Sequence, residues 1–159
     1  MARRGKSLFS LSTLLASFFG AAMIAGAFAY FNYKFSEYKF INFSEWIFYE
    51  KTDLFKPQSD RYIVLFYSSN KPGAVEAIKE VKAKYPIVAI DYYQQSVKSS
   101  EKITFVKSGT STMLKFIQRF NIYDVPTVFI IKKVKESLYK QDSMIRKLDT
   151  NNKLNLEGL

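Results

Sequence analysis

Residues 116–131 read F-I-Q-R-F-N-I-Y-D-V-P-T-V-F-I-I, and this stretch does most to indicate the fold. Apolar side chains recur at helical spacing as far as Phe120, which predicts an amphipathic helix. The segment Asp124-Val125-Pro126-Thr127 then leads into an apolar run at 128–131 that is typical of a buried strand. A helix that gives way to a buried strand is typical of an α/β protein.

Two further apolar runs predict strands that are covered on both faces, residues 61–67 (R-Y-I-V-L-F-Y) and 87–91 (I-V-A-I-D). Between them, Pro72 and Gly73 predict a turn, and residues 74–85 predict a helix that the next proline ends. Strand, helix and strand in this order predict a parallel pair with a right-handed crossover.

The remaining elements are shorter. Residues 103–106 predict an extra strand, and one of the two hydroxyl residues at 110–111 is expected to cap the helix that follows. The chain is expected to turn at residues 132–133, with a hairpin partner at 137–140. Nearer the N-terminus, Ser44 predicts the start of a helix that Pro57 stops and that carries Trp46, Ile47, Phe48 and Leu54.

The N-terminal region has the composition of a membrane anchor. No charged residue occurs from Leu8 to Tyr33. A helix over this run spans roughly 39 Å, against a hydrocarbon core of about 30 Å. The basic residues Arg3, Arg4 and Lys6 precede it, so the positive-inside rule predicts a cytoplasmic N-terminus at residues 1–7 and an exported remainder. We therefore expect a single-pass protein of the inner membrane with a periplasmic domain.

A cleaved signal peptide is the alternative to an anchor at 8–33. Residues 25–29 (A-G-A-F-A) contain small-residue patterns that resemble cleavage sites. A cleavable apolar region is usually about 7–15 residues long, which favours the uncleaved anchor. Beyond it we expect a linker at 34–43, a folded domain at 44–140 and a polar tail at 141–159.

The composition excludes most familiar catalytic sites. The chain contains neither cysteine nor histidine, which removes thiol nucleophiles, disulfides, serine–histidine triads and the usual zinc ligands. Residues 68–71 (S-S-N-K) match a Ser-x-x-Lys pattern but lack its companion motifs. The net charge is +10, with scattered lysines that favour a solvated surface near a membrane over nucleic-acid binding. We expect no enzyme activity, cofactor, metal or nucleic acid.

The order of elements over about residues 44–140 resembles the thioredoxin family. Two segments carry the resemblance. Residues 63–69 (I-V-L-F-Y-S-S) are similar to the strand that enters the family's active-site turn, and residues 116–131 are similar to the helix, cis-proline loop and strand that face it. The resemblance implies a mixed sheet flanked by helices, with Pro126 as the cis-proline.

The resemblance also implies that this member is inactive in redox chemistry. The family's Cys-x-x-Cys falls within residues 70–74 (N-K-P-G-A), and its buried acid matches Leu65. Thiol–disulfide exchange requires a thiolate, and no other residue type supplies one.

A cysteine-free thioredoxin fold resembles a binding module in which extended peptide lies between the active-site turn and the cis-proline loop. The partner-binding residues implied are Tyr67, Ser68, Ser69, Asn70, Lys71, Val125, Pro126 and Thr127. The family's final helix is at best shortened here, which would leave part of a sheet face uncovered. A second candidate surface is therefore Met144, Ile145 and Leu148.

The function expected is that of a non-catalytic, membrane-anchored accessory or assembly subunit that binds a protein partner in a membrane complex. The alternative is a degenerate component of a periplasmic thiol–disulfide or cytochrome-maturation pathway that binds clients without redox activity.

The charge flank of the anchor generates a topology prediction. A reporter fused after Leu159 is expected to show periplasmic activity and no cytoplasmic activity, because the basic residues precede the apolar run. Alkaline phosphatase and green fluorescent protein fusions measure the two locations. Cytoplasmic fluorescence from the fusion would contradict export of the domain.

Overall fold

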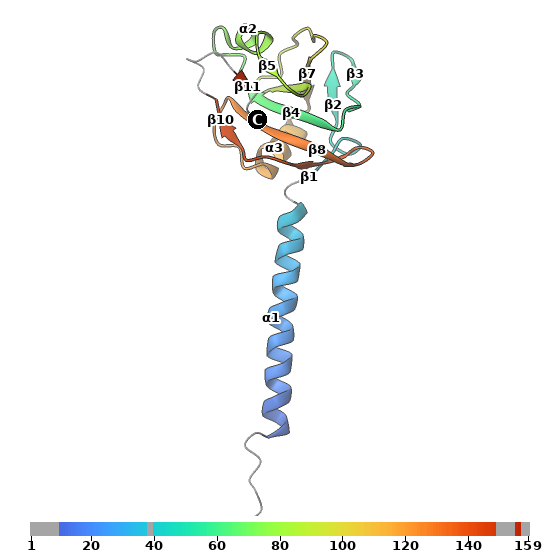
Figure 1. Cartoon of the computed structure of the whole chain (residues 1–159), viewed down its shortest axis with the longest axis vertical. Coiled ribbons are helices and arrows are strands. Elements are labelled where there is room, and N and C mark those ends of the chain that lie inside the picture. The colour runs from blue at the N-terminus through green and yellow to red at the C-terminus, as the bar shows by residue number, and fades with distance from the viewer. Residues whose placement is uncertain (1–9, 38–39, 149–154, 157–159) are drawn as a thin grey trace, which may run out of the picture. The chain divides into compact units, whose positions relative to one another are not determined.

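The structure is a computed structural model that describes residues 10–37, 40–148 and 155–156. The chain forms two compact units, Met1–Tyr38 and Lys39–Leu159. Figure 1 shows the long helix of the first unit and the strands and short helices of the second.

The first unit contains helix α1, Leu11–Glu37. The Ser10 hydroxyl accepts a hydrogen bond from the backbone N–H of Thr13, as an N-cap residue does. The segment Leu11–Tyr33 is long and apolar enough to cross a membrane. A signal sequence near the N-terminus has the same properties, so both interpretations of this segment stay open. The expected start at Leu8 lies outside the described residues.

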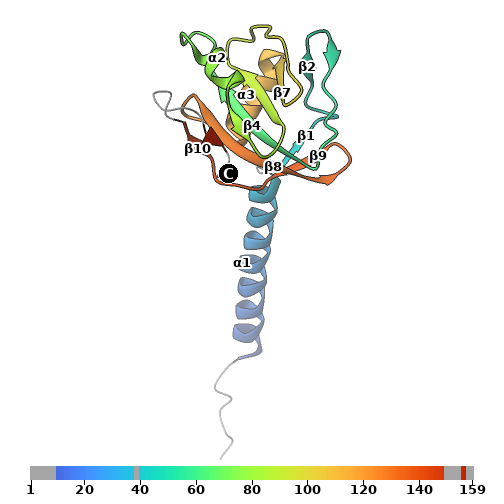
Figure 2. The ribbon, with the colours of Figure 1, turned by 45° about the horizontal axis from the view of Figure 1, so that its top comes forward.

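The second unit is built on a curled mixed sheet, in the order β1-β9-β8-β4-β6-β7-β2-β3, with β10 also paired to β8 (Figures 1 and 2). Strands β4, β6 and β7 are parallel, and β8 runs antiparallel to β4. The strands are β1 Phe40–Asn42, β2 Phe48–Glu50, β3 Asp53–Leu54, β4 Arg61–Tyr67, β6 Ile87–Asp91, β7 Ile103–Ser108, β8 Thr127–Lys135, β9 Leu138–Gln141 and β10 Arg146–Lys147.

A second, two-stranded sheet pairs β5 (Lys82–Ala83) with β11 (Asn155–Leu156). Two short helices complete the unit, α2 (Ala74–Lys79) and α3 (Thr110–Arg119). The strands predicted at 61–67, 87–91 and 103–106 are confirmed, as is the parallel pairing of the first two. The bond between Val125 and Pro126 is cis, as the resemblance implied.

The core is divided between the two faces of the sheet, because successive strand residues point to opposite sides. On one face, Val64 and Phe66 of β4 pack with Phe116 of α3 and with the residues before and within β2. On the other face, Ile63 and Leu65 pack with α2 and Leu156. Helices α2 and α3 therefore cover opposite faces of the sheet.

The helix predicted to begin at Ser44 is wrong. The chain forms a tight β2–β3 hairpin there, in which Glu50 pairs with Asp53 and Lys51 takes a positive φ of 57° at the turn. Trp46 and Phe48 are buried while the residues between and after them are exposed. This two-residue alternation is that of a strand, and over so short a segment the sequence pattern does not distinguish it from a helix.

Other boundaries also differ from those expected. Helix α2 ends at Lys79, and the residues that follow enter β5. Gly109, and not a hydroxyl residue, is the N-cap of α3. The turn expected at 132–133 is wrong, because β8 continues to Lys135. Its pairing with β4 ends at Lys132, and its pairing with β9 continues to Lys135.

The segments expected as a linker and a tail take part in the structure. Helix α1 extends to Glu37, and β1 begins at Phe40 within the expected linker at 34–43. Strands β10 and β11 both fall within the expected tail at 141–159. Both observations have the same cause: β8, β9 and β5 present backbone groups that these segments satisfy by pairing.

The buried tyrosine Tyr139 generates a prediction at alkaline pH. Burial raises the pKa of Tyr139 to about 12, whereas an unfolded tyrosine titrates near 10. Between these values the unfolded state binds fewer protons than the folded state, so the free energy of unfolding falls as pH rises through this window.

We expect Tyr139→Phe to flatten this decline, measured by denaturant unfolding of the micelle-bound chain at pH 8 to 12. Tyr123→Phe is the control, since Tyr123 is 88% exposed. If the free energy of unfolding declines as steeply in Tyr139→Phe as in the native chain, Tyr139 does not cause the alkaline loss of stability.

Candidate functional site

The candidate site lies where the parallel strands β4 and β6 end side by side, with Tyr67 opposite Asp91. Asp91 is only 1% exposed. Its Oδ1 accepts hydrogen bonds from the backbone N–H groups of Ser69 at 2.9 Å and Tyr93 at 3.2 Å, and its Oδ2 accepts one from Gln95 at 2.8 Å. One carboxylate thus fixes the loops that leave both strands.

The turn after β4 and the cis-proline loop face each other across this edge. The Nζ of Lys71 donates to the carbonyl oxygen of Val125 at 3.4 Å. Pro126 and Thr127 are buried, and Val125 is half-buried. The hydroxyl of Thr127 donates to the carbonyl of Asp124, which closes the loop on itself.

The eight residues expected at the groove lie on these two loops and the strand ends beside them. Tyr67 and Ser68 are buried and Ser69 is half-buried, while Asn70 and Lys71 are exposed. A ligand in contact with this edge would therefore meet the exposed turn and the half-buried Val125 side chain before any of the buried hydroxyl groups.

Two hydroxyl groups of the site are buried without a hydrogen-bond partner among the described residues, those of Tyr67 and Ser69. Burial, together with the nearby carboxylate of Asp91, raises the pKa of Tyr67 well above its usual value. Tyr67 is thus neutral throughout the physiological range. Within the described part of the chain, no group of three or more potential metal-ligating side chains occurs.

The chain's own C-terminal segment occupies the outer edge of β8 beside the cis-proline. Strand β10 pairs Arg146 with Val128 and Lys147 with Thr127. The pairing continues one residue further, where the backbone N–H of Leu148 donates to the carbonyl of Pro126 at 3.0 Å. A peptide strand could not add to this edge, which leaves the Val125 side of the loop as the accessible main chain.

The second candidate surface does not form one patch. Met144 is 84% exposed, but Ile145 packs against the core on the α3 face and Leu148 against the core on the α2 face. The uncovered sheet face that motivated this surface is not observed, because the sheet residues Ile63, Leu65 and Val128 are fully buried. The extended C-terminal segment covers part of what a final helix would cover.

Sequence reasoning missed a polar hollow of about 560 Å³ between the β2–β3 hairpin and the segment that precedes β4. The residues that line it include Glu50, Asp53, Lys56, Pro86, Glu101 and Thr104. The sequence pattern does not predict this hollow, because the β2–β3 hairpin forms part of its lining and is itself not predicted. Its charges are mixed and it exposes more polar than apolar surface.

Comparisons with protein-family models, curated proteins and solved structures find no match to this chain. The site is therefore interpreted from its own geometry.

Asp91 and Tyr67 generate opposite predictions for stability. Asp91→Asn replaces one acceptor oxygen by an NH₂ group that faces backbone N–H donors, so we expect the free energy of unfolding to fall by about 3 kcal/mol. Tyr67→Phe removes a buried hydroxyl without a partner, so we expect no loss and a gain of up to about 1 kcal/mol. Denaturant titration of the full chain in micelles measures both free energies of unfolding. A loss for Tyr67→Phe that is larger than the loss for Asp91→Asn would refute this account.

Proposed function

We propose that this chain is a non-catalytic, membrane-anchored protein of the thioredoxin-like fold that binds a protein partner as an accessory or assembly subunit of a membrane complex. The fold part of this proposal is supported by the parallel β4–α2–β6 unit and by α3, whose chain passes through the cis Val125–Pro126 bond into the antiparallel β8–β9 pair. The position of α2 and α3 on opposite faces supports it as well. Strand β7, the β2–β3 hairpin and β10 are additions to that pattern.

The observation that carries the binding proposal is the contact between Lys71 and the carbonyl of Val125. An extended peptide that lies along the cis-proline loop would donate a backbone N–H to such a carbonyl. Here a solvent-exposed lysine supplies the donor. Because its ammonium regains water when it leaves, a peptide can displace it at little cost.

The surroundings of this carbonyl suit a binding surface better than a catalytic one. The half-buried side chain of Val125 offers apolar contact, and the exposed Asn70 offers an amide to a peptide main chain. The carboxylate of Asp91 is buried and already accepts three backbone hydrogen bonds. Its role is thus to hold the turn in place for a partner.

This proposal predicts opposite effects of two substitutions. With a photo-crosslinking residue at Asn70 in the full-length chain, we expect a discrete crosslinked protein. Val125→Asp should reduce its yield more than tenfold, because a carboxylate would be desolvated at the contact. Lys71→Ala should raise the yield a few-fold by removing the competing donor.

Two controls separate this groove from other surfaces. Leu54→Asp is the control substitution at an exposed apolar residue of the β2–β3 hairpin, and it should leave the crosslink unchanged. A crosslinker at Met144 tests the second candidate surface. If folded Val125→Asp crosslinks as well as the native chain, the groove is not the site, and if the captured proteins are thiol-rich clients, the redox-pathway alternative gains support.

A further inference from the structure

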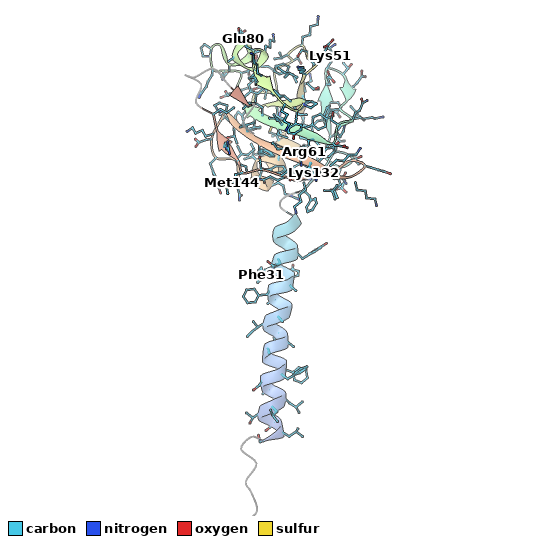
Figure 3. All side chains as sticks on the ribbon, in the orientation of Figure 1. Phe31, Lys51, Arg61, Glu80, Lys132 and Met144 are labelled. Atoms are coloured by element: carbon cyan, nitrogen blue, oxygen red, sulfur yellow. The ribbon has the colours of Figure 1, made fainter. Side chains whose placement is uncertain are left out.

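A row of basic side chains crosses the end of the sheet opposite to the candidate groove. Arg61 on β4 lies opposite Lys132 on β8, Lys132 lies opposite Lys140 on β9, and Lys140 lies opposite Phe40 on β1. Residues directly opposite each other on paired strands project from the same face. Four neighbouring strands therefore present three cations and an aromatic ring in one line, and Figure 3 shows Arg61 and Lys132 near each other.

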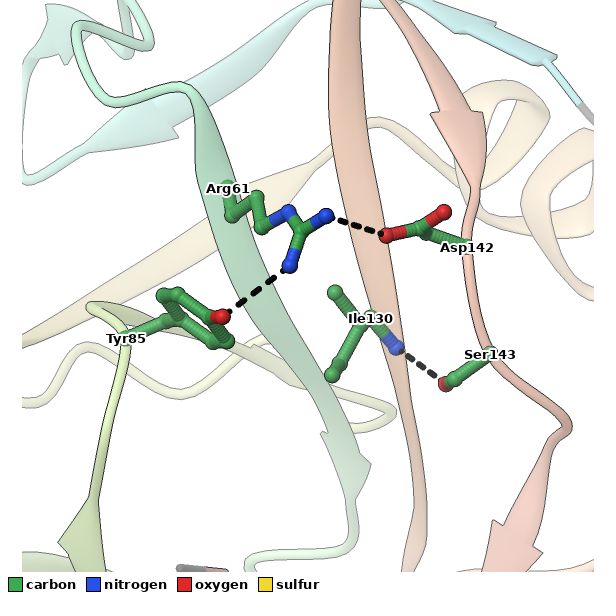
Figure 4. Close-up of polar contacts among 5 residues, drawn as sticks. All are labelled: Arg61, Tyr85, Ile130, Asp142 and Ser143. Atoms are coloured by element: carbon green, nitrogen blue, oxygen red, sulfur yellow. Dashed lines mark hydrogen bonds and ion pairs between the residues drawn. The ribbon is translucent and has the colours of Figure 1, made fainter.

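Internal contacts satisfy Arg61 but not the two lysines. Arg61 pairs with Asp142 at 3.3 Å and donates to the Tyr85 hydroxyl at 3.0 Å (Figure 4). Lys132 and Lys140 are both exposed, and among the described residues neither has an acidic partner. Lys140 lies over the Phe40 ring, 5.8 Å from its centroid. Like charges directly opposite each other repel. An external anion bound between the two lysines would reduce this repulsion.

The covalent chain keeps this row near the bilayer while the anchor is attached. Phe40 closely follows the apolar segment that ends at Tyr33. Helix α1 continues to Glu37, so the chain can carry Phe40 no further than about 16 Å from Tyr33. The polar headgroup region itself adds several ångströms to the hydrocarbon core. Strand β1, and with it Lys140, is thus tethered within reach of headgroup phosphates.

We propose that this basic row, Lys132 and Lys140 with Arg61 and Phe40, docks the folded unit on the surface of its own membrane by binding the headgroups of anionic lipids. Positive charge that the fold leaves unpaired meets negative lipid charge, and the short tether makes the encounter intramolecular. The hairpin tip adds the exposed Val134 and Lys135 next to the row. Docking requires only that the leaflet facing the folded unit is anionic, whichever side of the membrane that is. It does not involve the residues of the groove.

The test uses the full chain in nanodiscs of phosphatidylcholine with or without phosphatidylglycerol. The native sequence has no cysteine, so a polarity-sensitive dye can be attached at a single Val134→Cys. We expect a blue shift of its emission only when phosphatidylglycerol is present. The shift should disappear at about 1 M salt, where the Debye length falls to about 3 Å. A dye at Glu80→Cys, on the segment after α2, should not shift.

Neutralising the row should abolish the response. In Lys132→Gln/Lys140→Gln, the ratio of docked to undocked protein is expected to fall roughly thirtyfold, given the usual attraction of one lysine to an anionic surface. Lys98→Gln/Lys115→Gln removes the same charge from exposed positions outside the row and should retain docking. Equal shifts with and without phosphatidylglycerol, or equal losses in both double variants, would overturn the proposal.

Discussion

The burial of strand β4 on both faces is the constraint on which the rest of the domain depends. Every residue of β4 after Arg61 is at most 6% exposed. A strand in this position must have a partner on each edge and a cover on each face, since its backbone and its side chains are both removed from water. Strands β6 and β8 supply the edges. Helix α3 and the β2 region cover one face, and α2 and the C-terminal segment cover the other.

The same constraint explains which elements the sequence predicted. The runs at β4 and β6 are continuous and apolar, so their own composition identifies them as central strands. The β2–β3 hairpin lacks such a signal, because β2 is completed by hydrogen bonding to Lys107 and Ser108, which are far away in the sequence. The C-terminal segment has the composition of a polar tail for the same reason. Its order depends on β8 and on the carbonyl of Pro126, and local composition does not record that pairing.

The residues of the candidate site could be named from the sequence, but their contacts could not. The residues that flank the cis-proline could be named from the Val-Pro-Thr sequence and the strand that faces it. The role of Asp91 could not, because it consists of hydrogen bonds to three backbone N–H groups, which every sequence has in equal measure. The contact of Lys71 with Val125 likewise depends on the reach of a long side chain across a gap that only the fold defines.

Strand β4 also separates the two proposed surfaces. Arg61 begins the strand and belongs to the basic row, whereas Tyr67 ends it at the groove. A strand rises about 3.3 Å per residue, so its two ends are about 20 Å apart. When the basic row lies on the headgroups, the turn after Tyr67 is therefore about this distance along the strand from Arg61. The groove and the basic row are then formed by different residues, so a partner's extended segment can contact Val125 while the domain stays docked. Membrane docking would in this way leave the groove unoccupied.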